Sequence, residues 1–137
     1  MRIVLDTNVL VAGLLSPFGP PAAVLQLLLA EKVRICYDAR ILTEYRTVLA
    51  RARFGFDPGA VAAVQEFLEQ TGDLVVPAPW PDSLPDPADA MFLEVAVAGG
   101  AAYVVTGNVR HFPAESRRGV AVVSPAEFLE TPDVRGL

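Results

Sequence analysis

Three carboxylates and one amide stand at comparable places along this chain, namely Asp6, Glu44, Asp89 and Asn108. Oxygen donors of this kind, without a sulfur ligand or clustered imidazoles, are the set that a hard divalent cation such as Mg²⁺ or Mn²⁺ prefers. An acidic site holding such an ion typically acts on phosphate esters, because the metal generates hydroxide and neutralises charge in the transition state. The set therefore predicts metal-dependent phosphate-ester chemistry.

Asp6 and Asn108 each follow closely on a short apolar run. The runs Arg2–Leu5 and Ala102–Val105 have the length and the β-branched content of buried strands. Residues just beyond the carboxyl ends of parallel strands lie where open α/β sheets bind their ligands. Each position also has a purely structural interpretation. Asp6 would cap the helix expected over Val9–Leu15, and Asn108 would be a turn residue after glycine.

Glu44 is expected on a helix, at the border of its buried stripe. The spacing of Ile41 and Val48 around it predicts an amphipathic helix over Ala39–Arg53. The structural alternative is a glutamate at the rim that pairs with Arg40, four residues earlier.

Asp86 and Asp89 flank Pro87 at the expected start of a helix over Pro87–Ala98. Asp86 as N-cap, proline at the first helical position and Asp89 in the first turn are what a helix start favours. Asp89 also precedes Phe92 by three residues and so stands above the buried face of the helix. A metal-bound carboxylate at a helix N-terminus is electrostatically consistent with both interpretations.

Strands and helices alternate along the chain, which implies a mostly parallel sheet with helices on both faces. We interpret the proline-rich stretch 77–87 as an ordered loop, because the elements after it need the earlier strands for their sheet. The expected strands are Arg2–Leu5, Val33–Tyr37, Leu74–Val76, Ala102–Val105 and Val120–Val123, and the expected helices are Val9–Leu15, Pro21–Glu31, Ala39–Arg53, Ala60–Gln70, Pro87–Ala98 and a short one opened by a capping box at Ser124.

Length and hydrophobicity predict one domain with a substantial core. The chain has 137 residues, 53% of them hydrophobic, and a mean hydropathy of +0.40. We expect a single domain over residues 1–137, with a core over about 1–130 and a short C-terminal tail. No apolar run reaches the roughly 18 residues that a membrane span needs, so no membrane association is expected. The excess of apolar surface indicates contact with a partner subunit or another protein.

The net charge and the presence of only one cysteine, Cys36, and one histidine, His111, exclude some kinds of protein and site. A lone cysteine in an apolar stretch excludes disulfides and favours the reducing cytoplasm, and a lone histidine excludes a multi-histidine metal site. With 16 acidic and 11 basic residues the net charge is −5. This argues against a protein that coats nucleic acid, which needs a basic surface. It leaves open an enzyme whose acidic residues hold metal ions that engage phosphates.

The residues resemble those of a known family, the PIN domain. Four parts of the chain match it in order and spacing: Leu-Asp-Thr-Asn at 5–8, the helical Glu44, Asp-Pro-Ala-Asp-Ala-Met-Phe-Leu-Glu at 86–94 and Val-Val-Thr-Gly-Asn at 104–108. The resemblance is greatest to PIN proteins proposed as toxins of toxin–antitoxin pairs, relatives of the VapC ribonucleases. It implies a three-layer α/β/α sandwich around a mostly parallel sheet of four to five strands, and Mg²⁺- or Mn²⁺-dependent cleavage of RNA.

The same resemblance implies roles for particular residues. The family's acidic site corresponds to Asp6, Glu44 and Asp89, with Asp86 as a further candidate metal ligand and Asn108 beside them in the catalytic set. Residues expected to position the substrate are Thr7, Asn8, Thr106, Arg110 and His111.

Two positions depart from the family pattern. Asn108 stands where many relatives carry a fourth acid, and His111 stands where a second acid is often found. Asn108 can still coordinate a metal or hold a water, but it contributes no charge. This favours one metal, or weakly occupied sites, over two tightly bound metals.

Three hypotheses follow. The first is a Mg²⁺- or Mn²⁺-dependent endoribonuclease, the toxin of a pair, held inactive by an antitoxin. The second is a catalytically weak PIN-fold module that acts mainly in protein binding. The third, a phosphate-transfer or phosphatase domain, is disfavoured because no Gly-x-x-x-x-Gly-Lys loop is present.

Two structural expectations complete this interpretation. Asp6, Glu44 and Asp89 should converge within reach of one metal ion, beside Asn108. The helix Pro21–Glu31 should also present Leu25, Leu28 and Leu29 without partners in their own chain. We therefore expect a homodimer whose interface or adjoining groove includes this helix, with Ala39–Arg53 as the second wall for an antitoxin helix.

Overall fold

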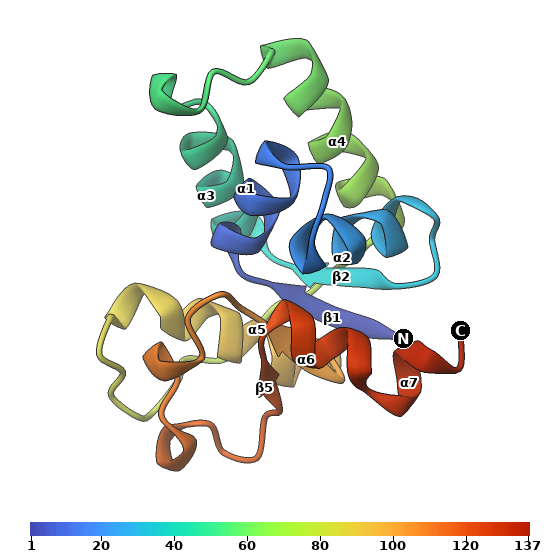
Figure 1. Ribbon diagram of the computed structural model, residues 1–137. Helices are drawn as coiled ribbons and strands as arrows, with labels where there is room; N and C mark the ends of the chain where they lie inside the picture. Colours follow the sequence, from blue (N-terminus) through green and yellow to red (C-terminus); the bar gives the residue numbers. More distant parts are fainter.

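The computed structural model describes residues 1–137 and contains one five-stranded sheet in the order β3-β2-β1-β4-β5 (Figure 1). All its strand pairs are parallel, and β1 lies in the centre between β2 and β4. The predicted parallel sheet is thus confirmed. The strands are β1 (Arg2–Leu5), β2 (Arg34–Tyr37), β3 (Asp73–Leu74), β4 (Tyr103–Val105) and β5 (Val122–Val123).

Helices connect and follow the strands. Between β1 and β3 lie α1 (Thr7–Leu15), α2 (Pro20–Leu29), α3 (Ala39–Leu49), the short 3-10 segment η1 (Ala52–Phe54) and α4 (Pro58–Thr71). After β3 come η2 (Pro87–Asp89), α5 (Ala90–Gly99), η3 (Val109–His111), η4 (Ala114–Ser116), α6 (Pro125–Glu130) and α7 (Pro132–Arg135).

The direction in which the chain crosses the sheet decides which face each helix covers, because crossovers between parallel strands are right-handed. From β1 through β2 to β3 the chain moves one way, which places α1 to α4 on one face. It then returns past β1 to β4, which places α5 on the other face, where it contacts β1, β2 and β4. Helix α6 packs against α2 and β4. The predicted three-layer α/β/α sandwich is confirmed (Figure 1).

The core is built on the central strand. Ile3, Val4 and Leu5 are at most 1% exposed, as expected for a parallel strand covered on both faces. Cys36 is fully buried, in agreement with the core position expected for it. Several helix starts also match their sequence signals. Asp38 caps α3 by accepting a hydrogen bond from the Ile41 N–H at 3.0 Å, and α6 opens with the predicted capping box.

Some boundaries differ from the prediction. Helix α3 ends at Leu49 instead of Arg53, because η1 and Gly55, at a φ of +64°, turn the chain toward α4. Strand β3 has two residues and ends before the prolines that follow. The helix expected over Pro87–Ala98 begins with the 3-10 segment η2, and the C-terminal tail contains α7, which was not predicted.

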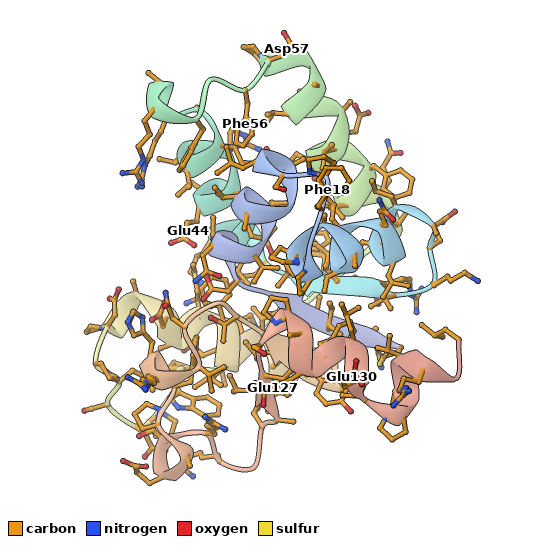
Figure 2. All side chains as sticks on the ribbon, in the orientation of Figure 1. Phe18, Glu44, Phe56, Asp57, Glu127 and Glu130 are labelled. Carbon is orange, nitrogen blue, oxygen red and sulfur yellow. The ribbon has the colours of Figure 1, made fainter.

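The expectation of unpartnered leucines on α2 was wrong for Leu25 and Leu28, and only Leu29 is exposed. Leu25 and Leu28 are 7% and 1% exposed within their own chain. They are buried because α2 packs against α1, α4 and α6, so three helices cover the circumference that the sequence left unpartnered. Leu29 is 43% exposed, and Phe18 in the loop before α2 is 83% exposed (Figure 2).

No single helix has both the length and the apolar character to cross a membrane. The consecutive helices α1 and α2 meet these criteria only when taken together, and a bend of 98° separates them.

Candidate active site

The strand order reverses next to β1, since the chain leaves β1 toward β2 and later returns to its other side as β4. Ligands of open α/β sheets bind at such a switch point, in the crevice beyond the carboxyl ends of the strands. Asp6 follows β1 and Thr106 follows β4, so both stand at this crevice. The N–H of Asp6 donates to the Val105 carbonyl at 2.9 Å, which continues the pairing of the two strands up to the crevice.

Asp6 is buried, with 8% of its surface exposed. The hydroxyl of the fully buried Thr106 donates a hydrogen bond of 2.7 Å to its Oδ2. Asp6 occupies the N-cap position of α1, but its side chain makes no capping hydrogen bond. The pKa of Asp6 is raised, with burial as the largest cause and the charge of Glu44 adding to it, against the lowering effect of the Thr106 hydroxyl and of the backbone N–H groups of Asn8 and Thr7. The carboxylate therefore has an environment unlike that of an ordinary cap.

Glu44 is half-buried on α3 (Figure 2). The Thr7 hydroxyl donates a hydrogen bond to its Oε2. The next residue, Tyr45, is fully buried and donates its hydroxyl hydrogen to the Leu5 carbonyl at the end of β1. This bond fixes the register of α3 against the strand that carries Asp6. The alternative pairing of Glu44 with Arg40 is wrong, because that arginine binds other acids, described below.

Asp89 stands at the junction of η2 and α5. Its side chain is 14% exposed, and its Oδ2 atom is buried without a hydrogen-bond partner. The Nδ1 atom of His111 lies 3.6 Å from this oxygen. Burial, followed by the charges of Asp6 and Asp86, raises the pKa of Asp89 from 3.8 to about 6, although the nearby His111 lowers it.

Asp6, Glu44 and Asp89 line one cavity of about 380 Å³, together with Thr7 and Asn8. Unlike a preformed metal site, it contains no group of three acidic, histidine or cysteine side chains close enough to hold an ion. The donor chemistry nevertheless fits a hard cation. The charge of Glu44 raises the pKa of Asp6, the charges of Asp6 and Glu44 raise the pKa of Asp89, and Asp89 keeps a buried oxygen free. The metal role of these residues stays a prediction.

Other predicted site residues lie around this cavity without lining it. Asp86 is exposed, and its Oδ1 accepts a hydrogen bond from the Ala88 N–H at 3.0 Å, which is the capping role considered for it. Asn108 is exposed, and its backbone N–H donates to the Thr106 hydroxyl at 3.0 Å. Arg110 is exposed on η3. None of these three residues lines the cavity, although the charge of Asp86 acts on Asp89 and Asn108 bonds to the threonine that holds Asp6.

Asn8 joins the two loops at the crevice. Its Oδ1 accepts a hydrogen bond from the Gly107 N–H at 3.0 Å. A Cβ atom at position 107 would lie 3.3 Å from this oxygen, so glycine allows the close approach. Asn8 thereby acts on the loop after β4 as well as lining the cavity.

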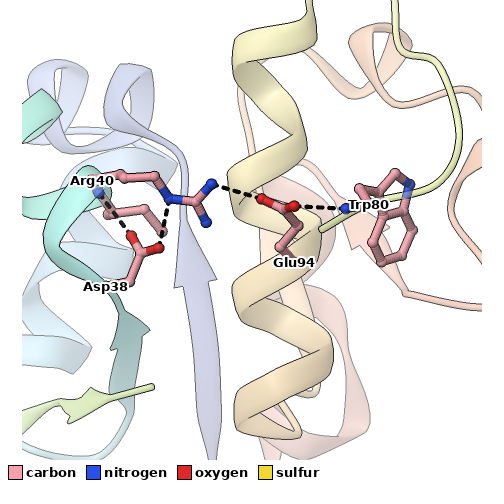
Figure 3. A network of polar contacts seen from close by, with 5 residues as sticks. Asp38, Arg40, Trp80 and Glu94 are labelled. Carbon is pink, nitrogen blue, oxygen red and sulfur yellow. Dashed lines mark hydrogen bonds and ion pairs between the residues drawn. The ribbon is translucent and has the colours of Figure 1, made fainter. Parts of the chain in front are cut away.

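A polar network beneath the site was not predicted. Arg40 donates from Nε to Asp38 at 2.7 Å and from Nη1 to Glu94 at 2.8 Å, and Glu94 also accepts the Trp80 backbone N–H at 2.6 Å (Figure 3). The network joins the start of α3 to the middle of α5 and to the proline-rich loop. Its signal in the sequence is Glu94 itself, a lone acid within an otherwise apolar helix.

Sequence reasoning also missed the arginines of the cavity. Arg51, Arg53 and Phe54 also line it, and the two arginines carry charges opposite to those of the three carboxylates. The available signal was the segment between Glu44 and Asp57, which carries three arginines and no acid in a chain of net charge −5.

Comparison with known families identifies the class of the protein. A family model described as PIN domain matches residues 2–110, which include Asp6, Glu44, Asp89 and Thr106, and the chain belongs to the PIN domain family. The resemblance found in the sequence is thus confirmed. No curated protein matches the chain in sequence.

The fold is also similar to that of a chain in the solved structure of FitAB bound to an IR36 DNA fragment. The TM-score is 0.56 and the sequence identity 19%, with 91% of this chain and 95% of that chain covered. The likeness supports the α/β/α architecture over nearly the whole length of the chain.

Proposed function

We propose that this PIN domain is a Mg²⁺- or Mn²⁺-dependent endoribonuclease. The observation that carries the proposal is the placement of Asp6, Glu44 and Asp89 around one cavity at the switch point of the sheet. Carboxylates gathered in a partly buried place destabilise one another unless a cation or protons compensate their charge. A divalent ion compensates that charge and brings the chemistry that RNA hydrolysis requires.

In this proposal Asp6, Glu44 and Asp89 would hold the ion, and the chemistry supplied by a bound ion would be activation of a water and neutralisation of charge on the phosphodiester. The chain's own residues prepare the ligands. Thr106 fixes one oxygen of Asp6, Thr7 holds one oxygen of Glu44, and Asp89 keeps its Oδ2 free. Asn108 and His111 border the site from the loop after β4, and Asp86 remains a weaker candidate because its carboxylate caps η2.

The proposal includes a biological context. The family resemblance supports a cytoplasmic toxin that an antitoxin protein holds inactive. We further propose a homodimer, with an interface that includes the exposed apolar side chains at the end of α1, in the loop before α2 and at the end of α2. Leu15, Phe18 and Leu29 are 53%, 83% and 43% exposed, and they replace Leu25 and Leu28 as candidates. Light scattering tests this part, since a particle of 14.6 kDa at high concentration would contradict it.

The alternative is a PIN-fold module with weak activity that acts mainly in protein binding. Asn108 and His111 in place of acids favour it, because they leave fewer negative ligands for a second metal.

RNA cleavage in Mn²⁺ distinguishes the two proposals. We expect the wild type to cleave single-stranded RNA, Asp6→Asn to lose the activity by at least two orders of magnitude, and Glu115→Gln, an exposed acid on η4, to retain it. Calorimetric titration with Mn²⁺ should show binding to the wild type and a loss of affinity in Asp6→Asn. Absence of both cleavage and Mn²⁺ binding in the wild type would favour the protein-binding module.

A further inference from the structure

The cavity of the three carboxylates has a basic side. Arg51 and Arg53 line it, and Arg51 also lines the neighbouring cavity of about 840 Å³ between α3 and the start of α5. Glu44 borders both cavities as well. The two depressions therefore meet at Glu44 and Arg51, and a ligand bound across them would pass the arginines and the carboxylates together.

Neither arginine is neutralised by its surroundings. Both are exposed, and neither forms an ion pair, although three carboxylates line the same cavity. Arg40 provides the contrast within the same region, since Asp38 and Glu94 both bind it. Guanidinium groups with free N–H donors are available to an external anion, and phosphate matches their planar geometry.

Aromatic contacts hold Arg53 in place. Its Cζ atom lies 4.9 Å from the centroid of the Phe54 ring, and Phe54 stacks on Phe56 with 5.7 Å between centroids. A cation–π contact orients the guanidinium over a ring face without occupying its N–H donors. Both rings are half-buried and pack against the core, so the stack is anchored to the fold.

The same cavity thus combines carboxylates suited to a cation with arginines suited to an anion. A strand of nucleic acid satisfies both, because it presents phosphates at regular intervals, one to the metal and the next to the arginines. An acidic peptide would use the arginines alone. Because the two cavities share Glu44 and Arg51, a single strand bound across both would carry its backbone past the arginines, as single strands do in basic grooves.

We propose that Arg51 and Arg53 bind the backbone phosphates of single-stranded RNA next to the cleaved bond, and that Phe54 positions Arg53 for this contact. The inference rests on the proposed ribonuclease function and names the part of the site that takes the substrate backbone. Phosphate contacts carry no sequence information. The two arginines therefore raise the affinity for any single strand without selecting its sequence.

Binding of a fluorescein-labelled single-stranded RNA of mixed sequence, followed by anisotropy, tests the proposal. The full-length chain carries Asp6→Asn, with Mn²⁺ present, so that the RNA is bound and not cut. Adding Arg51→Gln or Arg53→Gln should weaken binding roughly fivefold to tenfold at low salt. Each should also reduce the slope of log affinity against log salt by about 0.7, the contribution of one phosphate contact in a single strand.

Three further variants distinguish a direct phosphate contact by the two arginines from a general effect of lost positive charge. Arg53→Lys should keep the salt slope, and Phe54→Leu should lower affinity with a smaller change of slope, since it displaces a charge without removing it. Arg2→Gln removes an exposed arginine from the opposite, amino end of β1 and should leave binding unchanged. Circular dichroism checks that each variant remains folded.

The outcomes separate this proposal from the proposed function. Unchanged affinity and slope in Arg51→Gln and Arg53→Gln, or an equal loss in Arg2→Gln, overturns the assignment even if the wild type cleaves RNA. If a polyglutamate peptide binds through the arginines and RNA does not, the surface belongs to a protein partner and the proposal is wrong. Arginine-dependent RNA binding by a wild type that does not cleave would support the assignment and refute the ribonuclease.

Discussion

Replacing Asp89 by asparagine should stabilise the protein at neutral pH in the absence of metal. The folded structure holds this carboxylate in a buried position, near Asp6 and Asp86, with one oxygen unpartnered. Its pKa is raised from 3.8 to about 6, with burial as the largest cause. The ionised form is therefore less stable in the folded protein than in the unfolded chain, and Asp89→Asn removes that charge.

The difference between the two pKa values corresponds to about 3 kcal/mol, since each pKa unit corresponds to about 1.4 kcal/mol. Below pH 3.8 the carboxyl is protonated in both states and contributes nothing. Between 3.8 and about 6 the folded state binds the proton more tightly, so the free energy of unfolding falls as pH rises. Above that range the loss of unfolding free energy caused by the ionised Asp89 no longer changes with pH. A buried carboxamide without partners offsets about 1 kcal/mol, which leaves a gain of about 2 kcal/mol at pH 7.

Urea unfolding of the wild type and of Asp89→Asn, from pH 3.5 to 8 in EDTA, measures the difference between their free energies of unfolding. The variant should gain stability over the wild type as pH rises and should lose its advantage near pH 4. Glu115→Gln, an exposed acid, serves as the control and should follow the wild type at every pH. A variant that is no more stable than the wild type at pH 7, or a difference that does not depend on pH, would show that Asp89 is not held in an unfavourable ionised state.

Three other changes test neighbouring parts of the structure. Thr106→Val removes a fully buried hydroxyl that donates to Asp6 and accepts from Asn108, and should lower the free energy of unfolding by about 1–3 kcal/mol while weakening Mn²⁺ binding. Calorimetry and urea unfolding measure the two effects, and unchanged Mn²⁺ affinity would contradict the proposed orientation of Asp6. Glu94→Gln breaks the ion pair with the half-exposed Arg40 but keeps an acceptor for the Trp80 N–H, so unfolding should become easier by about 1 kcal/mol and less dependent on salt. An identical salt dependence would exclude a charge contribution. Cleavage should stop in EDTA and persist in His111→Ala, because the chain has no second histidine and its one cysteine, Cys36, is fully buried, so neither can form a metal-free nucleophile with His111. Activity that survives EDTA and is lost in His111→Ala would reverse this assignment.

The strand ends of the site were predictable because their signals are local. The four residues Arg2–Leu5 suffice to predict a buried strand. The polar residue after it must then lie at the carboxyl edge of a parallel sheet. For β4 the same argument was applied to Asn108, whereas the residue that contacts Asp6 at this strand end is Thr106. The positions of Glu44 and Asp89 at the buried side of their helices were predicted from helical spacing. This spacing assigns a residue to one side of a helix without reference to the rest of the chain. Their placement around one cavity agrees with that reasoning.

What the sequence did not reveal depends on contacts between distant segments. Leu25 and Leu28 looked unpartnered because the helix that completes their burial, α6, lies about a hundred residues further along the chain. Arg40 lies four residues before Glu44, at a spacing that suits an ion pair, yet it binds Glu94, 54 residues away. Helical periodicity describes one element at a time, so it shows that a residue faces inward without showing which residue it meets.

The position of the two arginines at the cavity depends on both the sequence and the three-dimensional structure. From the sequence, Arg51 and Arg53 belong to the last turn of the helix expected over Ala39–Arg53, where they would be ordinary solvated charges. The early end of α3 at Leu49 changes their position, because η1 turns the chain at that point instead of continuing the helix away from the sheet. That turn brings two cations to a cavity whose acids already repel one another. Opposite charges that share a cavity without pairing remain available to a ligand that carries both a metal ion and phosphates, which is the substrate complex of a metal-dependent nuclease.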